Sequence, residues 1–349
     1  MTLSTKWKQR GAALALGTVG GALFFTFHLP LAWLLGSLSA CLIATLLGVK
    51  LQGPGIAVPV LRVVLGLAVG AAFTPALFGR LGEIGLSLAL IPPFVVVIGS
   101  LGYAYYRKIG GYDRTTAFYA AMPGGFQDMM AMGEDRGAHL STLGLIHATR
   151  VVVLVFLLPF LINWLGGLDL GERSAVLIGV WPDAKGILTL FACGAVGWWA
   201  ATRLGISGAA VIGPMAASAI VHLAGITEAK PPMLLINMAQ LFIGIYVGCQ
   251  YQGSTIRQIV KVVGLSLGFM LVLLAISAAF TVLVYVLTSV DPMAVLLAYA
   301  PGGQAEMNVI ALVLDIDVAY VALHHLFRVM MVIIGASIIF SYVNKAGRT

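Results

Sequence analysis

The residue types best able to do chemistry occur twice in this chain, in the same order and at the same spacing. Each copy holds a carboxylate, a histidine and an arginine: Asp128, His147 and Arg150 in the first, Glu306, His325 and Arg328 in the second. A Pro-Gly-Gly triplet precedes each set, at 123–125 and at 301–303, and every matched pair has the same offset as the triplets. Polar residues are unfavourable in such an apolar chain, and here they repeat in register. This pattern predicts two pseudosymmetric halves with a site where the halves meet.

The triplet itself predicts a broken helix. Pro123 removes a backbone donor and two flexible glycines follow it, so a helix that enters this point should end there. The break releases unpaired N–H groups at the start of the next half-helix, which attract anions, and unpaired carbonyls at the end of the preceding one, which attract cations. Within a membrane such backbone is tolerated only when it is buried in protein or lines a wet cavity.

The histidine and the arginine of each copy are three residues apart and therefore share a helix face. An arginine in a membrane helix costs at least ~2.5 kcal/mol on insertion scales, so it must face a partner or water. We expect that partner to be the carboxylate on a broken helix, in the same half or across the pseudo-twofold axis. The alternative is structural: the arginine locks the broken helix to its neighbour and the histidine caps a freed carbonyl.

The copies differ in ways that bear on substrate choice. Gln304 replaces Phe126 and Asn308 replaces Met130, so the second copy is more polar and is expected to face the substrate. His324 has no counterpart, because Ile146 takes its place, and no role is assigned to it. The candidate solute-binding and ion-binding residues are Gly124, Gly125, Gln127, Asp128, His147, Arg150, Gly302, Gly303, Gln304, Glu306, Asn308, His325 and Arg328.

Composition sets the surroundings of these residues. Of the 349 residues 60% are hydrophobic and 9% charged, with a mean hydropathy of +1.02; soluble domains carry roughly 25% charged residues. The chain is therefore a polytopic helical membrane protein whose partner is the lipid bilayer. Its net charge of +7 is typical of Lys and Arg collected on the cytoplasmic side rather than of nucleic-acid binding.

Hydropathy predicts ten crossing helices and two broken or re-entrant segments. The segments interrupted by Pro-Gly-Gly are 115–133 and 293–313. The expected spans are 11–28, 30–49, 56–78, 84–106 and 139–164 in the first half, then 186–202, 207–225, 232–250, 260–288 and 318–342.

The distribution of Lys and Arg favours both termini in the cytoplasm and broken segments that do not cross. Five crossings per half invert the second half, giving a five-plus-five inverted repeat. The alternative is twelve helices in two parallel six-helix halves. The repeats are expected at 1–165 and 186–349, with an external loop at 166–185.

Metal and redox chemistry find little support in the pattern. Cys41, Cys193 and Cys249 lie singly in apolar segments without a CxxC pair, so they are interpreted as packing residues. The six histidines are dispersed, whereas copper or iron oxygen chemistry needs clustered ligands. We expect no enzyme activity, no metal and no cofactor.

A family resemblance rests on three elements. The repeated Pro-Gly-Gly-x-x-(Asp/Glu)-Met sequence, the His-x-x-Arg helices and the stretch LPLAWLLG at 29–36 resemble AbrB-type bacterial inner-membrane proteins, over essentially the whole chain. The resemblance implies a duplicated multi-pass domain in the inner membrane. Members carry labels such as ammonia monooxygenase or regulator of gene expression and are usually suspected to be transporters. No residue-level mechanism comes with it.

Three functions follow as hypotheses. The first is secondary transport of a small anionic or zwitterionic solute, coupled to H⁺ or Na⁺ through the carboxylates. The second is a membrane protein that regulates gene expression indirectly, and the third, less favoured, is a monooxygenase component. Nucleic acid is not an expected partner, and homo-oligomerisation is left open.

Overall fold

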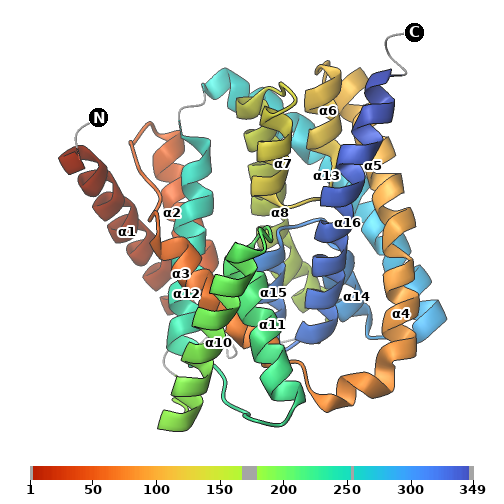
Figure 1. The fold of residues 1–349 in the computed structure, drawn as a ribbon. Coiled ribbons are helices and arrows are strands. Elements are labelled where there is room, and N and C mark those ends of the chain that lie inside the picture. The colour runs from red at the N-terminus through yellow and green to blue at the C-terminus, as the bar shows by residue number, and fades with distance from the viewer. Residues whose placement is uncertain (1–2, 167–178, 253–254, 346–349) are drawn as a thin grey trace. The chain divides into compact units, whose positions relative to one another are not determined.

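The computed structural model describes residues 3–166, 179–252 and 255–345, and the chain there is built from helices (Figure 1). Much of the expected loop 166–185 lies outside the described residues. The α-helices are α1 (Leu3–Thr26), α2 (Ala32–Leu46), α3 (Ala57–Gly70), α4 (Leu81–Ala89), α5 (Ile91–Lys108), α6 (Arg114–Ala121), α7 (Phe126–Glu134), α8 (Leu140–Gly166), α10 (Ala184–Arg203), α11 (Ala209–Leu223), α12 (Met233–Gly248), α13 (Ile256–Thr288), α14 (Pro292–Tyr299), α15 (Gln304–Leu314) and α16 (Val318–Lys345), with 3₁₀ helices η1 (Pro75–Arg80) and η2 (Cys249–Tyr251).

A helix occupies each expected span, with 84–106 divided between α4 and α5. Within the described residues, six helical stretches are long and apolar enough to cross a membrane: Pro75–Lys108, Leu140–Ile162, Ala184–Arg203, Met233–Tyr251, Arg257–Thr288 and Val318–Phe340. The others are shorter, and the total of ten crossings stays a prediction.

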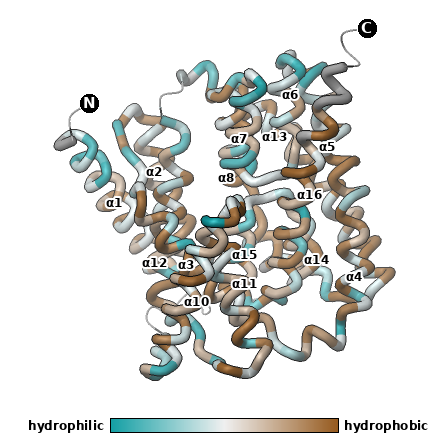
Figure 2. Tube along the Cα trace, viewed as in Figure 1, coloured by the Kyte–Doolittle hydropathy of each residue, from teal (hydrophilic) through white to brown (hydrophobic). Residues whose placement is uncertain are grey.

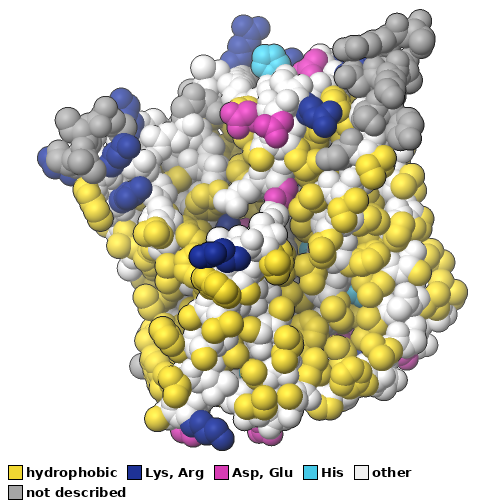
Figure 3. Space-filling view, viewed as in Figure 1, with side chains coloured by type: hydrophobic (Ala, Val, Ile, Leu, Met, Phe, Trp, Pro, Cys, Tyr) yellow, Lys and Arg dark blue, Asp and Glu magenta, His cyan; other side chains and the backbone are white. Residues whose placement is uncertain are grey.

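Large hydrophobic side chains cover the outside of these helices. Leu271 and Val286 on α13 and Phe191 on α10 are each about 70% exposed (71%, 72% and 72%). Figure 2 shows long hydrophobic stretches along α4 and α5, and most side chains visible in Figure 3 are hydrophobic. Apolar surface of this extent needs lipid around it, as the composition predicts.

The chain divides into two compact units, and neither coincides with a sequence repeat. Unit 1 comprises Met1–Arg80, Val155–Gln252 and Asn308–Ala319, and unit 2 comprises Leu81–Leu154, Gly253–Met307 and Tyr320–Thr349. Each unit therefore takes helices from both halves of the chain.

In unit 1, glycines let helix backbones touch. Gly20 of α1 meets Gly36 of α2 through backbone atoms, and Gly197 of α10 meets Gly213 of α11 in the same way. A side chain at any of these positions would collide with the opposing main chain. Small residues permit the same close approach in membrane helix pairs generally.

The remaining crossings of unit 1 join the two halves. Gly244 and Gly248 place α12 against the main chain of α2, while Gly66 and Gly70 place α3 against that of α11. A serine reinforces each crossing: Ser37 donates to Leu241 O at 3.1 Å and Ser218 donates to Leu67 O at 2.9 Å. Each half thus packs its third helix on the second helix of the other half.

In unit 2, long helices flank the entering half-helices. Gly102 of α5 makes room for Ala121 of α6, and Ser277 of α13 donates to the Tyr299 carbonyl of α14 at 3.1 Å. Phe94 packs edge-on against Phe280 and Tyr299, with ring centroids 5.1 and 5.0 Å away. The ends of both half-helices are therefore fixed inside packed protein.

The element boundaries repeat at the spacing of the sequence signature. α6 begins at Arg114 and α14 at Pro292, α7 at Phe126 and α15 at Gln304, and α8 at Leu140 and α16 at Val318. Each pair has the offset that separates Pro123 from Pro301. The predicted duplication of the broken segment and the helix after it is therefore present in the fold.

Candidate functional site

The Pro-Gly-Gly triplets interrupt the helices as predicted. α6 ends at Ala121 and α7 starts at Phe126, while α14 ends at Tyr299 and α15 starts at Gln304. The residues before the prolines, Met122 and Ala300, are extended, with ψ of 130° and 126°. Proline disfavours the helical conformation in its predecessor, so it sets the end of each entering half-helix.

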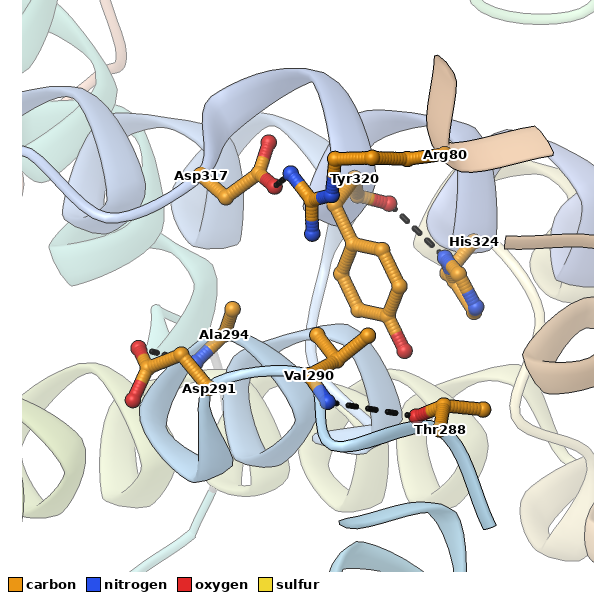
Figure 4. Close-up of polar contacts among 8 residues, drawn as sticks. All are labelled: Arg80, Thr288, Val290, Asp291, Ala294, Asp317, Tyr320 and His324. Atoms are coloured by element: carbon orange, nitrogen blue, oxygen red, sulfur yellow. Dashed lines mark hydrogen bonds and ion pairs between the residues drawn. The ribbon is translucent and has the colours of Figure 1, made fainter. Parts of the chain in front are cut away.

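An aspartate begins each entering half-helix. Asp113 accepts from the Thr116 amide at 2.9 Å, and Asp291 accepts from the Ala294 amide at 3.3 Å (Figure 4). Burial raises the pKa of Asp113, but hydrogen bonds from Thr116 and Thr115 outweigh it and hold that pKa below its ordinary value. These N-caps also match in the register of the repeat, which the sequence analysis overlooked although an Asp before a helix is a standard capping signal.

The histidine and arginine of each copy bind the carbonyls that the break releases. His147 Nε2 donates to Tyr119 O at 3.1 Å, and Arg150 donates to Met122 O at 3.1 Å and Gly124 O at 3.4 Å. Because a carbonyl only accepts, the proton of His147 lies on Nε2. We name this arrangement the carbonyl brace.

The second copy repeats the carbonyl brace with shorter bonds. His325 Nε2 donates to Leu297 O at 2.9 Å, and Arg328 donates to Ala300 O at 2.6 Å and Gly302 O at 2.7 Å. Arg328 also donates to Nδ1 of His325 at 3.0 Å, which makes that imidazole neutral. Within the described residues, both guanidinium groups donate to carbonyls, and Arg328 also to His325, rather than to the carboxylates expected from sequence. The structural alternative therefore describes the His and Arg side chains better.

The two glycines of each triplet have separate steric roles. A Cβ on Gly124 would lie 2.7 Å from Cε of Met129, and one on Gly302 would lie 2.8 Å from Cε of Met307. Both methionines are fully buried. The first glycine therefore leaves room for the methionine five residues later.

The second glycine leaves room for the carboxylate. Asp128 and Glu306 fold back so that a carboxylate oxygen occupies the place where a Cβ of Gly125 or Gly303 would be. Gly125 has φ −65° and ψ 142°, a conformation open to any residue, so the need for glycine is steric. These contacts account for the spacing of the two glycines, the carboxylate and the methionine in the Pro-Gly-Gly-x-x-(Asp/Glu)-Met pattern.

The second copy is the more enclosed one. Glu306 is 7% exposed and Asn308 1%, whereas Gln127 is exposed and Asp128 partly so. Among the residues that the structure describes, neither amide atom of Asn308 has a hydrogen-bond partner, and Nε2 of Gln304 has none either. Gln304 and Asn308 are one turn apart on α15 and share a face. Buried polar groups are nearly always paired, so this amide face is the part of α15 most in need of a ligand.

The predicted residues other than Asn308 belong to unit 2. Asn308 follows them on α15 and is the first residue of a unit 1 segment. Within the described residues, no group of three or more His, Cys, Asp or Glu side chains could hold a metal ion.

His324, to which the sequence assigned no role, belongs to a buried network on the other face of α16. Its Nδ1 donates to Tyr320 O at 2.8 Å (Figure 4), and its Nε2 lies 2.8 Å from Ser87 Oγ. Ser87 also contacts the Tyr320 hydroxyl, and Tyr299 donates to the Ser87 carbonyl at 2.6 Å. The network ties α4, α14 and α16 together. The Tyr-x-x-x-His spacing on one helix face was the signal that could have revealed it.

In unit 1, an ion pair follows the end of α15. Arg80 Nη1 lies 2.6 Å from Asp317 Oδ2 (Figure 4), with the two side chains 41% and 24% exposed. An ion pair exposed to this degree contributes little to stability, about 0–1 kcal/mol.

Comparisons with known proteins identify the family of the chain. The family described as "Transition state regulatory protein AbrB" matches residues 33–344. "Uncharacterized protein YhjN" of Bacillus subtilis (strain 168) is 24% identical, over 92% of this chain and 89% of that protein. "Putative regulator AbrB" of Escherichia coli (strain K12) is 22% identical, over 92% of each chain. The chain therefore belongs to the AbrB family, as the Pro-Gly-Gly and His-x-x-Arg elements indicated.

Proposed function

We propose that this AbrB-family membrane protein is a secondary transporter of a small anionic or zwitterionic solute, coupled to H⁺ or Na⁺. The observation that carries the proposal is the pair of broken helices, each held open by its own carbonyl brace. A stabilising pair alone does not need its break to be followed by the first turn of a second half-helix beside a carboxylate. Paired broken helices with exposed backbone ends are the usual solute and ion sites of transporters.

The polarity of the site supports an anionic group on the solute. α7 and α15 begin inside unit 2, and the amide groups of their first turns point out of the helix ends. Arg150 and Arg328 are buried, and their carbonyl partners carry no neutralising charge. A negative charge held between the breaks would offset these positive charges and accept from the helix N-termini.

The unpartnered amide of Asn308 supports a solute with further hydrogen-bonding groups. Its Oδ1 can accept and its Nδ2 can donate, and both atoms lack partners in the described part of the chain, while the residue is 1% exposed. A zwitterion or a hydroxy acid offers both kinds of group. This feature also agrees with the expectation that the second copy faces the substrate.

We further propose that the repeats are inverted and the termini cytoplasmic in a bacterial inner membrane. The Lys and Arg distribution supports this orientation. Within unit 2, α6 lies toward one end and α14 toward the other in Figure 1, which supports half-helices that enter from opposite membrane faces.

Uptake by proteoliposomes tests the proposal. Purified protein is reconstituted, a proton or sodium gradient is imposed, and the accumulation of labelled carboxylates and amino acids is measured. We expect Glu306→Gln to lose gradient-driven accumulation while it retains exchange of solute across the membrane. The control is Glu134→Gln, an exposed position on α7, which should behave like the wild type. Unchanged accumulation in Glu306→Gln would refute the coupling role, and absence of uptake for every solute would refute transport.

The name of the Escherichia coli relative favours a second candidate, regulation of gene expression. We propose that any such effect is indirect and follows from the transported solute. A change in gene expression that persists in cells carrying the transport-inactive Glu306→Gln variant would favour direct regulation instead.

A further inference from the structure

Two of the three cysteines, far apart in sequence, meet in unit 1. Cys41 lies on α2 and Cys249 directly follows α12. Cys249 packs on the apolar cluster that contains Cys41, Ala13 and Ile245. Both cysteines are free thiols.

The backbones of α2 and α12 approach each other closely at this crossing. Gly248, the residue before Cys249, lies so near α2 that a Cβ on it would be 2.8 Å from Cβ of Cys41. A disulfide needs Cα atoms less than about 7 Å apart and side chains that face each other. Cys249 packs against the cluster that contains Cys41, so both side chains lie at this crossing.

The two thiols differ in access. Cys41 is fully buried, and its Sγ donates to the Ala13 carbonyl at 3.5 Å. Cys249 is partly exposed. In such an arrangement the accessible thiol reacts with an oxidant to give a sulfenic acid. The buried thiol beside it then condenses with the sulfenic acid to a disulfide.

We propose that Cys41 and Cys249 form an oxidisable dithiol that closes to a disulfide between α2 and the end of α12. With a peroxide as the oxidant, Cys249 sulfur attacks one oxygen, the O–O bond breaks and water leaves, giving a sulfenic acid. Cys41 sulfur then attacks the sulfenic sulfur, its proton joins the departing hydroxyl, and a second water leaves as the S–S bond forms. Both thiols are oxidised and the peroxide is reduced to two waters.

The matching crossing of α3 and α11 serves as an internal control. Gly70 there corresponds to Gly248, and the side chain packed on it belongs to Ser218 instead of Cys41. Ala71 follows Gly70 where Cys249 follows Gly248. The same backbone approach therefore exists without the thiols, and a second pair can be built at it.

The experiment treats the purified full-length protein with hydrogen peroxide, blocks the remaining thiols with maleimide, and maps peptides by mass spectrometry without reduction. We expect alkylatable thiols to fall from three to one, with a peptide linking Cys41 to Cys249 and with Cys193 still alkylated. Cys249→Ser should leave Cys41 reduced. Links of similar yield that involve Cys193, or oxidation of Cys249 to sulfinic acid without a link, would overturn the proposal.

A gain of cross-linking provides a second measurement that does not depend on the native pair. Cys41→Ser and Cys249→Ser are combined with Ala71→Cys and Ser218→Cys, and the product is oxidised in the same way. A link between positions 71 and 218 supports the geometry of these crossings. If this transplanted pair forms a disulfide and the native pair does not, the dithiol proposal is refuted. The helices are then close enough for a disulfide, but the native thiols do not react.

Discussion

The carbonyl brace predicts that the two arginines differ in the stability they contribute. Arg328 is fully buried and reaches two carbonyls at 2.6 and 2.7 Å, whereas Arg150 is 6% exposed and its bonds are 3.1 and 3.4 Å long. Lysine keeps the positive charge but is a point donor that cannot span both carbonyls. In each Arg→Lys variant one carbonyl therefore loses its partner.

The magnitudes follow from these contacts. A hydrogen bond to a charged group contributes about 1.5–3 kcal/mol and an ordinary one about 0.5–1.5 kcal/mol. We expect Arg328→Lys to lower the free energy of unfolding by about 1.5–3 kcal/mol and Arg150→Lys by about 0.5–1.5 kcal/mol. Measured side-chain hydrogen bonds between membrane helices average about 0.6 kcal/mol. The prediction to be tested is therefore that Arg328→Lys loses more unfolding free energy than Arg150→Lys.

Unfolding of the purified protein in mixed micelles, titrated with a denaturing detergent and followed by circular dichroism, measures this difference. The matched control is Arg107→Lys, because Arg107 donates to the Tyr112 carbonyl at 2.8 Å in an exposed position where water can replace it. That variant should change stability by less than about 0.5 kcal/mol. Equal losses at Arg150 and Arg328, or a larger loss at Arg150, would refute the reasoning from bond length and burial.

Three further outcomes are expected. Gly303→Ala should displace Glu306 and reduce solute uptake at least tenfold. The control is Gly264→Ala, because a Cβ at this position would have no atom within 4 Å, and its uptake should be unchanged. Equal uptake in both variants would contradict the steric role of Gly303. Asn308→Leu should raise the free energy of unfolding by about 1–3 kcal/mol, because it removes unpaired buried groups, and should abolish uptake; a loss of stability would show that Asn308 already has partners. The pKa of Asp113 is lower in the fold than in the unfolded chain, so its ionic contribution is complete above about pH 4 and is lost as the pH falls through the folded-state pKa. The stability advantage over Asp113→Asn should thus disappear in acid, and a difference that is independent of pH would count against the ionic cap.

Sequence alone predicted the helices and their breaks. Apolar length places a span, and Pro123 and Pro301 end a helix whatever surrounds them, so these features depend on local physics. The duplicated boundaries of α6 and α14 were predictable for the same reason, since the repeat keeps its register.

The partners of the site residues were harder to predict. Helical spacing shows that His325 and Arg328 share a face, but it does not show what that face meets. A free carbonyl is present in every broken helix and leaves no mark in the sequence, whereas Glu306 is visible and was therefore expected as the partner. The meeting of Cys41 with Cys249 depends on a crossing between helices from opposite halves of the chain, which hydropathy does not encode.

The crossings of unit 1 have a consequence for how such a chain arises and assembles. α3 packs on α11 and α12 packs on α2. A chain that contained only one half would therefore leave the packing faces of its second and third helices without a protein partner. An ancestral single-copy protein would have covered these faces only by pairing with a second copy of itself. During synthesis α2 and α3 likewise cannot form these contacts until α11 and α12 have been made. Two separately expressed halves should for this reason complement each other, while either half alone should be degraded.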